Sequence, residues 1–288
     1  MLSSPLFNIF FAAVTHTVVV RFREDPDIVR NLVHREEDLE EDVVGVNSDP
    51  LACVRRAVWR MLYADDAGIV GKSAEGLAKM MTAIVTVFEA AGLTAVSEKK
   101  TETMLLRTPD QEPRTSPLVV EAAGQRYRQT TQFLYLGGHV DVSADIMPEI
   151  KRQVRLAWAC YSRFKRKLYD MEAAPFALKL RMLKAEVMET LLYGCVTWTL
   201  GKEHFAELRT AHHRFLLLII GFQRRQRSDH LMSYAKAQCE SVETTIRKRR
   251  LLFAGAVQRT HNERLTCRVM FGTMAGGENP GPGRPEKN

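Results

Sequence analysis

Residues 58–70 read VWRMLYADDAGIV, and this stretch gives the sharpest indication of the fold in the whole sequence. Two short apolar segments with strand-forming residues flank Asp65 and Asp66, a pattern typical of a β-hairpin with both carboxylates at its turn. Carboxylates bind Mg²⁺ as hard oxygen ligands, and a close pair of them serves two-metal phosphoryl transfer. An ordinary Asp-Asp turn, whose side chains bond the turn backbone, explains the same pair equally well. We therefore predict the hairpin and hold the metal site as a hypothesis.

A helix and further strands are expected after this hairpin. Apolar residues recur at helical spacing from Ser73 to Ala91, with Ser73 as the cap and Gly92 as the stop. Strand-like stretches follow at residues 93–96 and 103–106. Three prolines between residues 109 and 117 predict a loop, after which residues 133–138 read FLYLGG, a short aromatic strand running into a double-glycine turn.

The last third of the chain is predicted to be mostly helical. Long basic segments with helical character cover residues 147–169, 177–192 and 202–222, and a further basic segment follows at 246–259. Residues 276–288 are rich in glycine and proline and are expected to be disordered. Strands followed by helices indicate the α+β class.

Charge is divided unequally between the halves of the 288-residue chain, whose formal net charge is +7. Residues 1–150 hold 15 Lys and Arg against 22 Asp and Glu, a net charge of −7. Residues 151–288 hold 26 against 12, a net charge of +14. A basic half of this size favours a polyanionic partner such as nucleic acid.

Five widely spaced cysteines argue against a disulfide framework and favour reduced thiols inside a cell. A zinc site would need two close pairs of ligands. Cys239, His261 and Cys267 come nearest to this arrangement, but they lack the second short pair.

The N-terminal 20 residues contain no charged side chain, so a signal peptide or a membrane anchor has to be weighed. No basic residue precedes the apolar run and Asn8 interrupts it, which argues against both. A buried helix fits better, because Ser3 or Ser4 can cap it and Pro5 suits its first position. In this interpretation Asn8 points toward a cleft, and four residues form the apolar face: Phe7, Phe10, Phe11 and Val14.

The order of the motifs resembles the palm of non-LTR retrotransposon reverse transcriptases. The matching motifs are Ser-Pro-Leu-Phe-Asn at residues 4–8, Tyr-Ala-Asp-Asp at 63–66, Lys-Thr at 100–101 and Phe-Leu-Tyr-Leu-Gly-Gly at 133–138. The resemblance continues through Leu-Tyr-Gly at 192–194, Trp198 and the basic segment at 246–259. It implies an RNA-directed DNA polymerase that extends a DNA primer on an RNA template, using Mg²⁺ and deoxynucleoside triphosphates.

The resemblance also implies roles for single residues. Asp65 is the expected metal ligand with Asp66 as its weaker companion, and Tyr63 lies beneath the primer terminus. Lys100 approaches the triphosphate as a cation or general acid, although a solvated surface lysine between two glutamates remains an equal alternative. These assignments make Asp65, Asp66 and Lys100 the candidate catalytic residues.

Nucleic-acid contacts are implied along the whole chain. The resemblance implies that the N-terminal helix borders the template cleft, that residues 134–138 form the primer grip and that the basic helices bind phosphates. For the aromatic strand, packing in the core without any nucleic-acid contact is the alternative. The expected contact residues are Ser4, Pro5, Phe7, Asn8, Tyr63, Leu134, Tyr135, Leu136, Gly137, Gly138, Arg152, Arg155, Lys165 and Arg166.

Two parts of the family's polymerase have no match here, namely the fingers and the palm strand that carries the first catalytic Asp. Because a two-metal site draws ligands from two strands, we expect weak Mg²⁺ binding and no catalysis by this chain alone. The sequence thus predicts a partial, truncated palm at 1–146, a basic helical thumb at 147–222, a basic helical region at 223–275 and a tail at 276–288.

Two further expectations complete this picture. The chain is expected inside the cell, in the nucleus or cytoplasm and away from membranes, and a retroelement ribonucleoprotein is its candidate assembly. A noncatalytic nucleic-acid binding protein that uses only the basic half remains the alternative function, and a secreted or anchored protein led by residues 1–20 is a weaker one. Adjacent His212 and His213 are interpreted as a helix-surface pair rather than a metal site.

Overall fold

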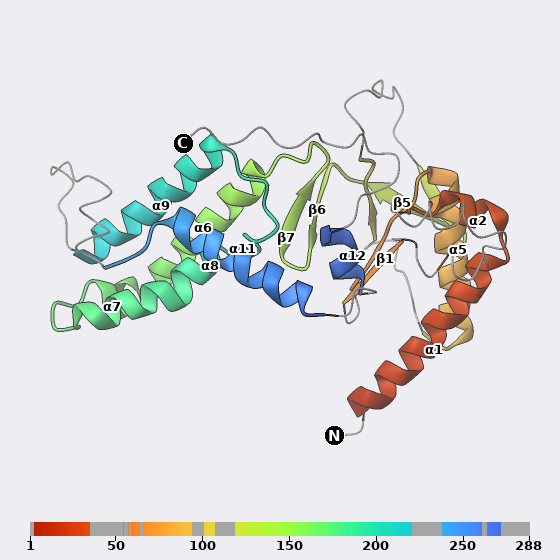
Figure 1. The fold of residues 1–288 in the computed structure, drawn as a ribbon, viewed down its shortest axis with the longest axis horizontal. Coiled ribbons are helices and arrows are strands. Elements are labelled where there is room, and N and C mark those ends of the chain that lie inside the picture. The colour runs from red at the N-terminus through yellow and green to blue at the C-terminus, as the bar shows by residue number, and fades with distance from the viewer. Residues whose placement is uncertain are drawn as a thin grey trace. The chain divides into compact units, whose positions relative to one another are not determined.

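The computed structural model combines helices with small sheets, which confirms the predicted α+β class (Figure 1). Contacts between residues divide the chain into two compact units, one of residues 1–131 with 260–288 and one of residues 132–259. In this division the hairpin that contains residues 133–138 groups with the helices that follow it. The structure describes these residues: 3–34, 54, 57, 59–63, 66–93, 101–106, 119–220, 238–260 and 264–271.

Three helices build most of the first unit, α1 (Ser3–Arg23), α2 (Pro26–Asn31) and α5 (Ala74–Ala90). The predicted limits of α5 are confirmed. The Ser73 hydroxyl accepts the N–H of Gly76 at 3.0 Å, and Gly92 adopts a φ of 76° just beyond the helix. The helices enclose a core of buried apolar residues: Val18, Val19, Phe22, Ile28, Leu32, Val54, Ala57, Trp59 and Met80.

The predicted N-terminal helix is confirmed, but its predicted apolar face is partly wrong. Phe10 is 42% exposed, and the buried stripe lies further along α1, at Val14, Val18, Val19 and Phe22. The first turns of α1 are exposed because α5, the helix that covers α1, ends beside Phe11. Phe11 already meets Phe88, near the end of α5, with ring centroids 5.8 Å apart, and Figure 1 shows the first turns of α1 running past α5.

Two small sheets complete the first unit, together with the short helix α12 (Leu265–Phe271). Strands β1 (Arg60–Tyr63) and β2 (Asp66–Ile69) form the predicted antiparallel hairpin. The second sheet has the order β3-β5-β4 and packs its buried residues against α5. Its strands are β3 (Glu102–Thr103), β4 (Val120–Ala122) and β5 (Gln125–Gln129).

The agreement for these strands is uneven. Of the strand predicted at residues 103–106, only Thr103 lies in a strand, the two-residue β3, and residues 104–106 form no strand. Residues 94–96 of the strand predicted at 93–96 lie outside the described residues. The β4–β5 hairpin was not predicted. Its turn residues Ala123 and Gly124 have φ values of 51° and 74°, the left-handed conformation that two-residue hairpin loops require.

The second unit joins a hairpin to a group of packed helices. Strand β6 (Gln132–Tyr135) pairs with β7 (Gly138–Asp141), and the helices predicted at 147–169 and 177–192 are confirmed within one residue at each end. The helix predicted at 202–222 is confirmed over residues 202–220, and residues 221 and 222 lie outside the described residues. Two of them contain π-helical segments, labelled η. The helical elements are α6 (Met147–Phe164), η1 (Lys165–Tyr169), α7 (Phe176–Met182), η2 (Leu183–Met188), α8 (Glu189–Leu191), α9 (Lys202–Ile220) and α11 (Val242–Gln258).

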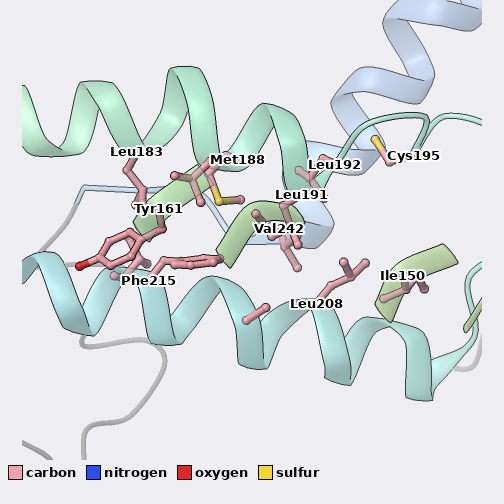
Figure 2. Packing of buried hydrophobic residues seen from close by; sticks show 14 of the residues in the cluster. Ile150, Tyr161, Leu183, Met188, Leu191, Leu192, Cys195, Leu208, Phe215 and Val242 are labelled. Carbon is pink, nitrogen blue, oxygen red and sulfur yellow. The ribbon is translucent and has the colours of Figure 1, made fainter. Parts of the chain in front are cut away.

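Large apolar and aromatic side chains from these helices form one continuous core (Figure 2). Tyr161 stacks on Tyr169 with ring centroids 4.5 Å apart and packs against Phe215 at 5.6 Å. Burial raises the pKa of both tyrosines to about 12. Because α6, η1 and α9 all contribute rings, the aromatic cluster fastens the two longest helical segments of the unit to each other.

The interpretation of His212 as a surface residue is wrong. Only 3% of this residue is exposed, because it falls on the buried stripe of α9 with Leu208, Ala211, Phe215 and Leu216. Burial, and secondarily the neighbouring His213 and Lys184, lowers the pKa of His212 to about 4. The imidazole is therefore neutral near pH 7.

Two further sequence expectations bear on the described residues. Cys160, Cys195, Cys239 and Cys267 are free thiols, in agreement with the expectation of reduced cysteines. Within the described ranges, no helix combines the length and the apolar character needed to cross a membrane.

Candidate nucleic-acid interface

The first candidate site surrounds the β1–β2 hairpin. The antiparallel register pairs Tyr63 with Asp66, and Asp66 is exposed at the start of β2. Asp65, Lys100 and the side chain of Tyr63 lie outside the described residues. No cluster of three or more metal-binding side chains occurs in the part of the chain that the structure describes. Exposed carboxylates suit Mg²⁺ in chemical type, and the metal site stays a prediction.

The predicted template-facing residues Ser4, Pro5, Phe7 and Asn8 all belong to α1. Their side chains lie outside the described residues, so the expectation that Asn8 faces a cleft stays a prediction.

The second candidate site is the β6–β7 hairpin, which carries the expected primer grip. The register pairs Tyr135 with Gly138, leaving Leu136 and Gly137 as a two-residue turn. Leu134 is 59% exposed, whereas Tyr135 is half-buried. Both turn residues have positive φ, 50° at Leu136 and 78° at Gly137. A positive φ is unusual for leucine, because its Cβ crowds the backbone there.

Side chains of the helical part hold both carbonyl groups of this turn. The Tyr193 hydroxyl donates to the Leu136 carbonyl at 2.9 Å, and Arg152 Nη1 on α6 donates to the Gly137 carbonyl at 2.9 Å. A Cβ on Gly137 would lie 3.2 Å from Tyr193 Cε1, closer than most Cβ contacts. Glycine at this position therefore allows the tyrosine ring to lie against the turn.

Glu149, in the first turn of α6, connects the hairpin to the helix a second time. Its carboxylate is buried, and Oε2 accepts the backbone N–H of His139 at 3.0 Å. Gln153 Nε2 donates to the other carboxylate oxygen at 2.6 Å, and Arg152 lies 3.5 Å from Oε2. A buried carboxylate is costly without such partners, and here three groups from the hairpin and α6 compensate its charge.

The predicted phosphate-binding residues fall into two groups. Arg152 is committed to the contacts with Gly137 and Glu149, and its side chain is only 23% exposed. Arg155, Lys165 and Arg166 are exposed, together with the neighbouring Lys167. Among the described residues none of these four cations has a carboxylate partner. Unpaired cations are available to phosphate groups, whereas a cation already paired inside the protein is not.

Sequence reasoning did not assign a site role to Tyr193 or Glu149. Tyr193 belongs to the Leu-Tyr-Gly motif, which indicated the family resemblance but did not indicate which residue the tyrosine contacts. Glu149 gave no signal, because a glutamate in the first turn of a helix is explained by the helix dipole alone. Only the chain path, which brings residues 136, 149, 152 and 193 together, identifies them.

Comparison with known proteins finds a relative in Caenorhabditis elegans whose name describes it as a transposon-derived protein. The two chains are 24% identical over 215 residues, which cover 73% of this chain and 75% of the relative. The chain is thus similar over most of its length to a transposon-derived protein. No family model matches the chain, and no solved structure matches it.

Proposed function

We propose that this chain is the palm and thumb portion of a retroelement reverse transcriptase and that it binds an RNA–DNA hybrid. The observation that carries the proposal is the junction between the β6–β7 hairpin and α6. The segment that resembles a primer grip is bonded at both turn carbonyls to the helical part that follows it. The motif order and the transposon-derived relative support the same assignment.

The basic helical part supplies the expected binding energy. Lys165, Arg166 and Lys167 are consecutive exposed cations on η1, at the end of α6 that is remote from the hairpin. Contacts of this kind recognise the phosphate backbone without reading sequence and weaken as salt displaces them. An RNA template paired to a DNA primer offers a continuous row of phosphates to such a surface.

Catalysis is expected only when a further carboxylate joins the site. Asp65 and Asp66 are supplied by one hairpin, whereas two-metal nucleotidyl transfer holds its ions about 4 Å apart between ligands of two strands. We therefore propose that the isolated chain binds the hybrid, binds Mg²⁺ only weakly and does not extend the primer. In the complete enzyme, Asp65, Asp66 and Lys100 would act on the incoming deoxynucleoside triphosphate.

The proposal is tested by fluorescence anisotropy with a labelled RNA–DNA hybrid, alongside primer extension with Mg²⁺ and deoxynucleoside triphosphates. Wild-type chain is expected to bind at low salt without extending the primer. The double substitution Lys165→Gln with Arg166→Gln should weaken binding several-fold. A matched control, Arg21→Gln with Arg30→Gln, removes the same charge from cations already paired with Glu24 and Asp27 and should leave affinity unchanged.

Two results would contradict the proposal. Absence of hybrid binding at low salt would remove the nucleic-acid function. Primer extension that Asp65→Ala abolishes would instead demonstrate a complete active site, and the expectation of an inactive chain would then be wrong.

A further inference from the structure

The turn of the β6–β7 hairpin adopts a conformation that its own sequence does not favour. Two-residue hairpin loops with positive φ at both positions prefer Asn-Gly or Asp-Gly, whereas this loop is Leu136-Gly137. A leucine with a φ of 50° persists only where surrounding groups hold it in place. The contacts that hold this turn are therefore informative about its use.

Both carbonyl oxygens of the turn are occupied by side chains from outside the hairpin. Tyr193 takes the Leu136 carbonyl and Arg152 takes the Gly137 carbonyl, each at 2.9 Å. The Tyr193 ring also lies against the Cα of Gly137, where a Cβ would come within 3.2 Å. Two directed bonds and one close contact leave the turn little freedom to change its conformation.

A third contact fixes the outer edge of the hairpin. Antiparallel pairs alternate between bonded and non-bonded positions, so the His139 N–H points away from β6. Glu149 Oε2 accepts that N–H at 3.0 Å. The same carboxylate oxygen lies 3.5 Å from Arg152 Nη1, which joins the edge contact to the turn contact.

We propose that Tyr193, Arg152 and Glu149 are positioning residues that lock the β6–β7 hairpin onto α6 in the orientation used to hold nucleic acid. This inference rests on the proposed function and deepens it. The three side chains touch the hairpin backbone and leave the exposed side chain of Leu134 to face a ligand. Their role is to keep the hairpin in one orientation while unpaired cations elsewhere on the helices bind phosphates.

The decisive variant is Tyr193→Phe, because it removes one hydroxyl and leaves the ring against Gly137. Tyr161→Phe is the matched control, since it makes the same chemical change within the helical core. Amide hydrogen exchange of residues 132–141 should become about 2- to 10-fold faster in Tyr193→Phe, the range expected for one lost hydrogen bond, and exchange within α6 should not change. The control should leave exchange of the hairpin unchanged.

Hybrid binding supplies the readout that a merely structural role would not give. Tyr193→Phe should weaken affinity by about 2- to 10-fold without altering the salt dependence, because no charge is removed. Arg152→Lys, which keeps the charge but has a single nitrogen to share between Gly137 and Glu149, should weaken affinity in the same way.

The outcomes separate the two proposals. Unchanged hairpin exchange in Tyr193→Phe would overturn the positioning role, and so would faster exchange spread evenly through residues 132–259 with a lower melting temperature. Wild-type chain that fails to bind the hybrid would overturn the proposed function, whatever the exchange data show. Faster hairpin exchange together with unchanged hybrid affinity would overturn the link between positioning and binding.

Discussion

Burial of a single imidazole makes the stability of the helical unit depend on pH. His212 is 3% exposed, and its pKa is lowered to about 4, first by burial and then by His213 and Lys184. The unfolded chain takes up this proton near pH 6.5, so the folded state is favoured above pH 6.5 and loses this advantage as the pH falls toward 4. The loss amounts to about 3–4 kcal/mol at most, from about 1.4 kcal/mol for each pKa unit between 6.5 and 4.

Urea unfolding at pH 7 and at pH 4.5 measures this effect. His212→Leu, which has no proton to take up, should show a smaller loss of unfolding free energy between these pH values than wild type. His16→Gln, at an exposed position of α1, should behave like wild type. An unchanged pH dependence in His212→Leu would assign the effect to other groups.

The turn of the β6–β7 hairpin is held by contacts with Tyr193 and Arg152, although its Leu-Gly sequence does not favour the observed conformation. Replacing Leu136 with Asn suits the positive φ and should stabilise the hairpin by about 0.5–1 kcal/mol. The same change removes an exposed apolar side chain from the predicted primer grip, so hybrid affinity should fall. Urea unfolding and anisotropy measure the two effects separately. A destabilised variant would indicate that the Leu136 side chain has a packing role.

Elements with a strong periodic pattern were predictable, and elements defined by distant partners were not. The spacing of Leu77, Met80 and Ile84 and the serine cap identified α5, because a helix satisfies its backbone locally. Strands β4 and β5 escaped prediction, since three to five residues carry too little pattern and β5 depends on β3 as its second neighbour. The burial of His212 was not predicted, because the buried stripe of α9 includes this polar residue among apolar ones.

Charge asymmetry in the whole molecule leads to a prediction about salt. Residues 151–288 carry a net charge of +14, and Arg155, Lys165, Arg166 and Lys167 are exposed cations without carboxylate partners among the described residues. Four phosphate contacts give a slope of about −3 to −4 in a plot of log affinity against log salt, or a loss of roughly 100-fold between 50 and 200 mM.

Anisotropy titrations in KCl with EDTA measure this slope without competition from divalent ions. Neutralising both Lys165 and Arg166 should make the slope shallower by roughly 2. A slope between 0 and about −1 in the wild-type chain would assign binding to apolar or hydrogen-bonding contacts instead.

The candidate site was only partly visible at the scale of the whole chain. The order of the motifs predicted the hairpin that contains Asp66 and the segment that contains Leu136, because each is defined by a short continuous stretch of sequence. The partnership of Tyr193 with Leu136 spans 57 residues, and no periodicity connects two such positions. Arg152 had the right charge for a phosphate ligand, and only its contact with the Gly137 carbonyl assigns it a different task.

The division into two units also separates the chain's natural chromophores. Of its three tryptophans, Trp59 lies in the core of the first unit against Phe22, whereas Trp158 and Trp198 belong to the helical unit. Phenylalanine at positions 158 and 198 would leave one indole, and its emission would then report the first unit alone. Intrinsic fluorescence of this variant can therefore follow the first unit as it melts, without any attached label.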